Sequence, residues 1–230
     1  MIIQGYEISG RLPMFTAENR QKNRDGIKTM TRRIVKQAYD KVDPSPPFAV
    51  CRASDSGWIA WYGQPREDIE AFTKKAYRHG FECPYGKPGQ YRVMTEPLIH
   101  GPDDAYYKDD GQPVFHAETG ERIKWRWKRD VLSSLFMPME AARSVFLIED
   151  IKVEQLGEIS EEDIEKEGID VTYHEGTIAT GVVDLPNGNR RHSTALYCFE
   201  SLWRSIHGPG SWERDKDKWV WAISYKKEEN

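Results

Sequence analysis

The side chains with the clearest chemical potential in this sequence lie at residues 26–33, which read G-I-K-T-M-T-R-R. Lys28 and Thr31 are three residues apart, so on a helical turn they would share one face. An amine beside a hydroxyl can activate that hydroxyl as a nucleophile, and the adjacent Arg32 and Arg33 suit a phosphate or carboxylate ligand. Composition alone favours a simpler interpretation, a solvated basic turn. These residues by themselves leave both interpretations open.

The same segment resembles the G-x-K-x-x-T-x-R signature of the ASCH family, which is related to the PUA-like RNA-binding domains. Other motifs similar to those of phage and prophage members follow between about residue 4 and residue 225. They are Cys83–Gly89, Met94–Pro97, Met137-Pro138 with Ala142-Arg143, Glu154–Ser160, and Leu202-Trp203 through Trp221. Each motif is short, and the order in which they occur makes the resemblance more specific than any one of them.

The resemblance implies a fold and an activity. The fold is an α+β, PUA-like mixed β-barrel with flanking helices, formed as one domain over residues 1–230 with insertions near 38–82, 100–130 and 170–193. Some relatives remove the acetyl group of N4-acetylcytidine with a Lys, a Thr and a Glu, which match Lys28, Thr31 and Glu96 here. Thr31 would attack the amide carbonyl, Lys28 would accept its proton, and Glu96 would protonate the leaving amine.

Several cations are candidate contacts for a nucleic acid or another anion. Arg143 matches the arginine of the family's M-P-x-x-x-x-R element and joins Arg32 and Arg33 in this set. Lys124 and Arg126 lie in a segment, 122–128, that alternates with period two and would place its cations on one strand face. The opposite face would carry Ile123, Trp125 and Trp127. The pattern favours a half-buried strand with a solvated basic face, and a nucleic-acid groove wall is the alternative.

The bulk composition limits the classes of partner. The net charge is −4, yet residues 1–37 hold eight Lys/Arg against three acids, and residues 149–170 hold ten acids against two Lys. This asymmetry favours a local anion site over a cationic surface that coats nucleic acid. The three cysteines are widely separated, which is typical of reduced thiols in the cytoplasm. We expect no cofactor and no metal site, and the lack of a long apolar run or signal-peptide pattern predicts a cytoplasmic protein of the bacterial host with no membrane partner.

Local patterns predict strands and helices without regular βαβ alternation. Expected strands cover 2–8, 48–53, 58–62, 91–96, 122–128, 145–156 and 219–225, and expected helices cover 16–24, 67–80, 160–168 and 194–206. Residues 100–122 and 172–193 are expected to form loops or small hairpins. Ser160 is a predicted N-cap with an acid three residues later, and Gly168 is the predicted stop of that helix.

The leading functional hypothesis is a protein that binds RNA or a modified nucleoside through a cleft around Lys28, Thr31, Arg32, Arg33 and Glu96. Hydrolysis of an N4-acetylcytidine-like amide is the second hypothesis, and metal-assisted RNA cleavage is the third. A different class is a phage assembly or host-interaction protein whose basic segment binds an acidic protein partner. Acetate release distinguishes the hydrolase, and salt-sensitive binding of short RNA distinguishes the RNA-binding protein.

Overall fold

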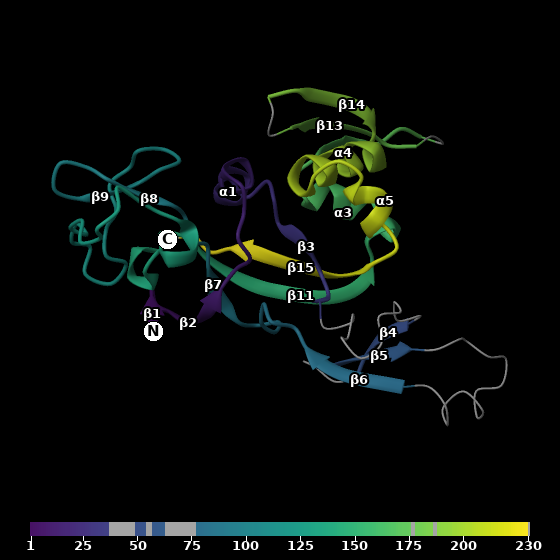
Figure 1. The fold of residues 1–230 in the computed structure, drawn as a ribbon, viewed down its shortest axis with the longest axis horizontal. Helices are drawn as coiled ribbons and strands as arrows, with labels where there is room; N and C mark the ends of the chain where they lie inside the picture. The colour runs from purple at the N-terminus through teal and green to yellow at the C-terminus, as the bar shows by residue number, and fades with distance from the viewer. Residues whose placement is uncertain (37–48, 54–56, 63–76, 176–177, 186–187, 230) are drawn as a thin grey trace. The chain divides into compact units, whose positions relative to one another are not determined.

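A computed structural model describes residues 1–36, 49–53, 57–62, 77–175, 178–185 and 188–229 (Figure 1). Its contacts divide the chain into two compact units, each built from separate stretches of sequence. Unit 1 comprises 1–29, 88–150 and 225–230, and unit 2 comprises 30–87 and 151–224. The chain is α+β, with more strand than helix, and the described sheets form no closed barrel. No helix in the described part is long and apolar enough to cross a membrane.

The sheet of unit 1 begins with a tight hairpin. Strands β1 (Ile2–Ile3) and β2 (Tyr6–Arg11) pair antiparallel, with Ile3 opposite Tyr6. The expected single strand over 2–8 is therefore wrong, because Gln4 and Gly5 both take positive φ and reverse the chain. Strand β7 (Tyr91–Val93) runs parallel to β2 and antiparallel to the start of β11 (Val145–Gln155). The strand expected over 91–96 ends at residue 93, which leaves Glu96 in the connection that follows.

Helix α1 (Ala17–Arg24) and a small second sheet complete unit 1. Thr16 caps α1 by accepting the Asn19 backbone N–H at 3.3 Å. The second sheet contains β8 (Leu98–His100), β9 (Ala105–Tyr107) and β10 (Val131–Leu132), with β8 in the centre. Two short 3₁₀ helices, η2 (Ser134–Phe136) and η3 (Met139–Ala141), precede β11.

Residues 122–128 do not form the expected continuous strand. Isolated bridges join Lys124 to Asp104 and Arg122 to Phe115. The predicted alternation of burial is nevertheless confirmed: Ile123 is buried, Trp125 and Trp127 are half-buried, and the cations are exposed. Period-two burial therefore arises here from an extended segment that is only partly bonded to its neighbours.

The core of unit 1 lies between β2, β7, the start of β11 and the second sheet. Its buried side chains include Ile3, Val93, Leu98, Tyr107, Val114, Met137 and Val145. At the chain end, the Tyr225 ring lies edge-on to Phe146 with ring centres 5.6 Å apart, and its hydroxyl donates to Asn23 at 2.8 Å. This contact ties the C-terminal strand to the last turn of α1, immediately before the Lys28 segment.

Unit 2 contains the remainder of β11, strand β3 (Met30–Ile34) and most of β15 (Trp219–Lys227), and β15 pairs antiparallel with β3. A second sheet has the order β4 (Ala49–Arg52), β5 (Gly57–Tyr62), β6 (Tyr77–Glu82). The hairpin predicted over 48–62 is confirmed by the β4–β5 pairing. The helix predicted over 67–80 is wrong at its end, where residues 77–80 belong to β6, and its residues 67–76 lie outside the described residues.

The rest of unit 2 packs helices on a three-stranded sheet, β12 (Asp170–Thr172), β13 (Thr180–Asp184) and β14 (Arg190–Thr194). Helix α4 (Ala195–His207) lies against β13 and β14, and α5 (Ser211–Asp215) and α3 (Glu161–Lys166) lie beside α4 (Figure 1). The 3₁₀ turn η4 (Leu156–Glu158) precedes α3. The predicted cap is confirmed, since Ser160 accepts the Asp163 backbone N–H at 3.2 Å, and Gly168 takes positive φ just after the helix.

Asp215 at the end of α5 makes the stability of unit 2 depend on pH. Its side chain is buried; burial raises its pKa, but bonds from Arg214, Lys218 and Trp203 outweigh this and lower the pKa to about 2 from 3.8. A depressed folded-state pKa gives stability that is complete above the unfolded pKa and is lost as pH falls through the folded one.

We therefore expect the free energy of unfolding of the wild type to exceed that of Asp215→Asn by about 2 kcal/mol near pH 6. This difference should shrink as the pH falls from 4 to 2. Urea titrations of both proteins over this range measure it. A gap that stays constant with pH would contradict the assignment to Asp215.

Candidate functional site

Glu96, one of the residues predicted from sequence, lies at the centre of a set of ion pairs in unit 1. Its side chain is 1% exposed, and guanidinium groups from two other segments reach it. Arg143 binds it with two parallel bonds, Nε to Oε2 at 2.8 Å and Nη2 to Oε1 at 2.7 Å, and Arg24 donates to Oε1 as well. A carboxylate that accepts several charge-assisted bonds is a strong anchor for the groups around it. The structure thus brings Glu96 and Arg143 together.

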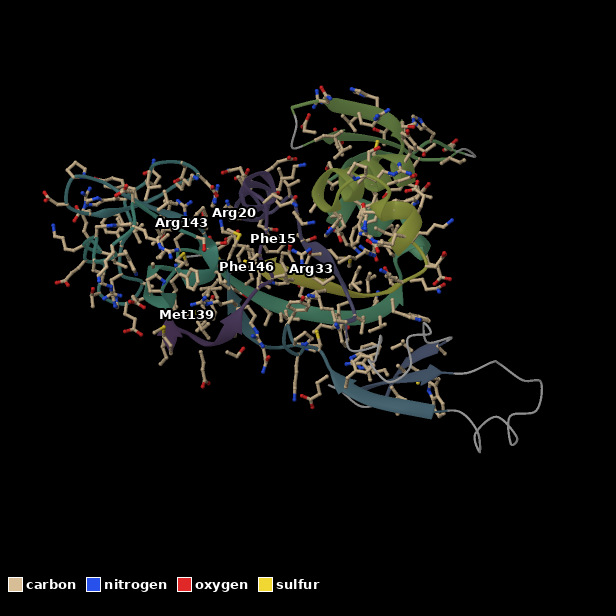
Figure 2. All side chains as sticks on the ribbon, in the orientation of Figure 1. Phe15, Arg20, Arg33, Met139, Arg143 and Phe146 are labelled. Atoms are coloured by element: carbon tan, nitrogen blue, oxygen red, sulfur yellow. The ribbon has the colours of Figure 1, made fainter. Side chains whose placement is uncertain are left out.

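The ion pairs extend beyond Glu96 to two aspartates after β9. Arg20 binds Asp109 with Nε–Oδ2 at 2.6 Å and Nη2–Oδ1 at 2.8 Å, and Arg143 Nη2 lies 2.7 Å from Asp110 Oδ2. We call the whole set the arginine–carboxylate cluster, and it comprises Arg20, Arg24, Arg143, Glu96, Asp109 and Asp110. Its three cations and three anions balance in formal charge. Figure 2 labels Arg20 on α1 and Arg143 just before β11.

Local structure explains how these distant residues meet. Arg20 and Arg24 are four apart on α1, so they emerge on the same face of the helix. Asp109 and Asp110 occupy the turn after β9, where Tyr107 N–H donates to Gln112 C=O at 2.9 Å. The sequence interpretation missed these four residues because a polar helix and an Asp-Asp turn are typical of solvated surface. The i, i+4 arginine pair was the one available signal.

Arg143 and Tyr107 form the open side of the cluster. The Arg143 guanidinium carbon lies 3.7 Å from the centre of the Tyr107 ring, and the Tyr107 hydroxyl donates to the Ala141 carbonyl at 2.7 Å. Burial lowers the pKa of Arg143, but Glu96 and Asp110 outweigh it and raise the pKa overall. Burial also raises the pKa of Tyr107, so the phenol stays protonated and serves as a donor. Arg143 is therefore a permanently charged, rigidly held group.

A pocket of about 400 Å³ in unit 1 adjoins the cluster. Its walls include Gln4, Tyr107, Gln112, Phe115, His116 and Arg143. The Phe115 ring is 46% exposed, and His116 Nδ1 accepts backbone N–H groups from Glu118 and Thr119 at 3.3 Å each. The bonds that Arg143 makes to described residues use Nε and Nη2, and Arg143 is one of the residues that line the pocket. The pocket therefore combines an aromatic face, amides and a guanidinium.

Lys28 and Thr31 do not lie on a helical turn, so they do not share the face that such a turn would give them. Thr31 belongs to β3, opposite Ile223, and Lys28 lies in the irregular segment between α1 and β3. Both side chains are buried, with 2% exposure for Lys28 and 1% for Thr31. Lys28 belongs to unit 1 with Glu96, whereas Thr31 belongs to unit 2, so the three predicted catalytic residues are divided between the units.

Arg32 occupies a separate cluster in unit 2. Its Nε donates to Glu154 at 2.9 Å, its Nη2 lies 2.8 Å from Asp163, and its Nη1 lies 3.2 Å from Glu167. Burial lowers its pKa, but Glu167 and Glu154 raise it above the usual value. The side chain is 0% exposed, so Arg32 contacts three carboxylates of its own chain. Neighbouring Arg33 is half-buried and donates to the Arg32 carbonyl at 3.0 Å.

The remaining predicted cations are at the surface of unit 1. Lys124 pairs with Asp104 at 2.9 Å, and Arg126 pairs with Glu140 at 2.7 Å while its guanidinium carbon lies 5.4 Å from the Trp127 ring centre. Neither side chain lines the pocket. Among the described residues, no three His, Cys, Asp or Glu side chains are grouped so that they could hold a metal ion.

The chain was compared with known proteins at three levels. No family model, no curated protein and no solved structure matches it.

Proposed function

We propose that this protein binds a modified nucleoside, or one base of a short RNA strand, in the pocket beside Arg143. The observation that carries the proposal is the make-up of the pocket wall: an exposed Phe115 ring, the amides of Gln4 and Gln112, and a fixed guanidinium. Bases are recognised by stacking on aromatic rings and by hydrogen bonds to their edges, which are the groups this wall supplies. A volume of about 400 Å³ lies in the range of small-ligand sites.

The charge balance of the arginine–carboxylate cluster favours this class of ligand. Three guanidinium groups are paired with three carboxylates, so the pocket wall carries little net charge. Binding dominated by phosphates needs several uncompensated cations. A nucleoside, or a base presented by one loop or end of an RNA, needs shape and hydrogen bonds instead. The resemblance to ASCH proteins and the PUA-like barrel that it implies are part of the same proposal.

Hydrolysis of an acyl-amide is the second candidate function. It is supported by the resemblance of residues 26–33 to the G-x-K-x-x-T-x-R signature, because relatives that deacetylate N4-acetylcytidine use a Lys, a Thr and a Glu. In this proposal Thr31 attacks the acyl carbonyl while Lys28 accepts the Thr31 proton, and the amine leaves with a proton from Glu96. Water then hydrolyses the acyl-threonine ester, which releases acetate and restores the Thr31 hydroxyl. Glu96 accepts bonds from two guanidinium groups as the structure stands, so proton donation requires that one of them moves away.

We expect Phe115→Ala to weaken binding of cytidine or N4-acetylcytidine by roughly tenfold, because a base stacked on an aromatic ring gains about 1–3 kcal/mol. Isothermal titration of the nucleosides and of a short single-stranded RNA into the purified protein measures the effect. The matched control is Phe136→Ala, whose ring is 61% exposed on η2 in the same unit but lies outside the pocket wall.

Equal affinity in the Phe115→Ala variant and the wild type would contradict the pocket assignment. Release of acetate from N4-acetylcytidine, abolished by Lys28→Ala and by Thr31→Ala, would establish the hydrolase instead. If the folded protein bound no nucleoside or RNA and released no acetate, a protein-interaction role would be the better account.

A further inference from the structure

The three-stranded sheet of unit 2 ends at β14, and no other described strand pairs with the far side of that strand. The strand order places β13 in the centre and β14 at this edge (Figure 1). Three consecutive residues of β14, Arg190, Arg191 and His192, are exposed. An exposed edge strand presents backbone groups to which another extended chain can add. We call this side of β14 the free edge.

The register of β13 and β14 fixes the direction of the backbone groups at the free edge. Leu185 N–H donates to the Asn189 carbonyl at 2.8 Å, which marks a hydrogen-bonded pair at the turn between the strands. Hydrogen-bonded and non-hydrogen-bonded pairs alternate along an antiparallel ladder, and the register continues without a shift. The pairs that contain Arg190 and His192 are therefore of the second kind. The N–H and C=O groups of these two residues point away from β13, toward the free edge.

The side chains along this edge are basic. Arg191 lies on the face toward α4, where its guanidinium carbon is 5.4 Å from the centre of the Tyr197 ring. Arg190 and His192 lie on the opposite face, because side chains alternate along a strand. Arg190 pairs with Asp184 at 3.2 Å, but both side chains are more than half exposed, so solvent weakens the pair. Strand β14 itself contains no acidic residue.

These charges discriminate between the possible occupants of the free edge. A second copy of β14 would bring the arginines of two strands together, and like charges on paired strands repel each other. Cations on natural edge strands oppose self-pairing in this way. An acidic strand has the complementary charge, and its backbone can bond to the outward groups of Arg190 and His192.

We propose that the free edge of β14 binds an extended acidic segment of another protein, which adds to the sheet as a fourth strand. Backbone bonds to Arg190 and His192 hold the segment in place. Two adjacent carboxylates of the segment lie on opposite faces of the sheet, one beside Arg190 and the other beside Arg191. The free edge belongs to unit 2 and the nucleoside pocket to unit 1, so the two functions can be tested separately.

Labelled peptides of about six residues, the usual length of a strand, test this interaction. Each peptide carries two adjacent glutamates among valine and threonine residues, and the position of the glutamate pair varies across the set. We expect the full-length protein to bind at least one member, with an affinity that falls as salt is added, measured by fluorescence anisotropy. The same peptide with lysines in place of the glutamates should bind about tenfold more weakly or not at all.

Variants of β14 separate backbone pairing from charge. His192→Pro removes an outward N–H but no bond to β13, which is the situation in which an edge strand tolerates proline, and we expect it to abolish peptide binding. His192→Ala keeps that N–H and should bind within about threefold of the wild type. Arg190→Glu and Arg191→Glu should each weaken binding by about tenfold, because each places a carboxylate beside one of the peptide.

Melting temperatures establish that each variant is folded, and if the proline variant unfolds, the two glutamate variants decide the test. Equal peptide affinity in His192→Pro and His192→Ala, or in the glutamate variants and the wild type, overturns the proposal. Absence of binding by every acidic peptide to the folded wild type also overturns it. Self-association of the wild type in sedimentation, lost in His192→Pro, would assign the free edge to a second copy of this chain instead.

Discussion

Replacing Glu96 with glutamine is expected to destabilise unit 1 by about 3 kcal/mol and to abolish measurable ligand binding in the pocket. The carboxylate is the shared partner of Arg24 and Arg143 and is almost completely buried. Glutamine keeps one acceptor, but its NH₂ group faces guanidinium donors. Two partly buried cations then lose their charge partner, which costs more than the pair itself contributes.

The effect on binding follows from the position of Arg143. Glu96 holds this side chain through two parallel bonds, and without them the guanidinium is no longer fixed at the pocket wall. Urea unfolding measures the stability, and nucleoside titration measures the binding. The matched control is Glu140→Gln, which removes the partner of Arg126, a side chain that is 62% exposed. This surface pair should contribute no more than about 1 kcal/mol. Equal losses of stability and of nucleoside binding in Glu96→Gln and Glu140→Gln would show that Glu96 does not anchor Arg143 at the pocket.

The second large effect is expected in unit 2, for Arg32→Met. This side chain is fully buried and neutralises Glu154, Asp163 and Glu167, of which Glu167 is the least exposed. Methionine fills part of the volume but leaves three carboxylates facing one another without a cation. We expect a loss of about 3–5 kcal/mol in the free energy of unfolding, measured by urea titration at neutral pH.

Arg190→Met is the control for that variant. Arg190 also pairs with an acid of the same unit, Asp184 at 3.2 Å, but both side chains are more than half exposed. The Arg190→Met variant should lose no more than about 1 kcal/mol in the free energy of unfolding, because solvent screens the pair. If the Arg32→Met variant were as stable as the Arg190→Met variant, Arg32 would not be the structural centre of the acidic segment. That result would favour its predicted role as an anion-binding residue.

Features that depend on a few neighbouring residues could be predicted from the sequence. Ser160 is an N-cap and Gly168 ends the helix region that it begins, because caps and positive-φ glycines act through bonds within one turn. The long strand expected over 145–156 is present as β11, which begins with a run of four apolar residues, Val145–Ile148. The hairpin of β4 and β5 follows from the turn residues between two apolar runs.

Predictions failed where tertiary contacts decided the outcome. Residues 77–80 carry an acceptable helical pattern, yet they pair with β5 as part of β6, because a neighbouring strand edge provides bonds that local propensity does not anticipate. Thr31 joins β3 by pairing with β15, so Lys28 and Thr31 do not share the face that a helical turn would give them. The charged face of 122–128 has the predicted exposure without a continuous strand.

Local sequence patterns indicate which residues could do chemistry, where most helices and turns begin and end, and that the chain is of mixed α+β character. The pairing of cations with carboxylates, in contrast, is known from the tertiary structure and not from these patterns. Arg24 and Arg143 bind Glu96 from 72 and 47 residues away along the chain. Arg32 is close to Arg24 in sequence, yet it pairs with carboxylates more than 120 residues later. The physical reason is that a buried charge is stable only beside its partner, and that partner is supplied by the packing of distant segments.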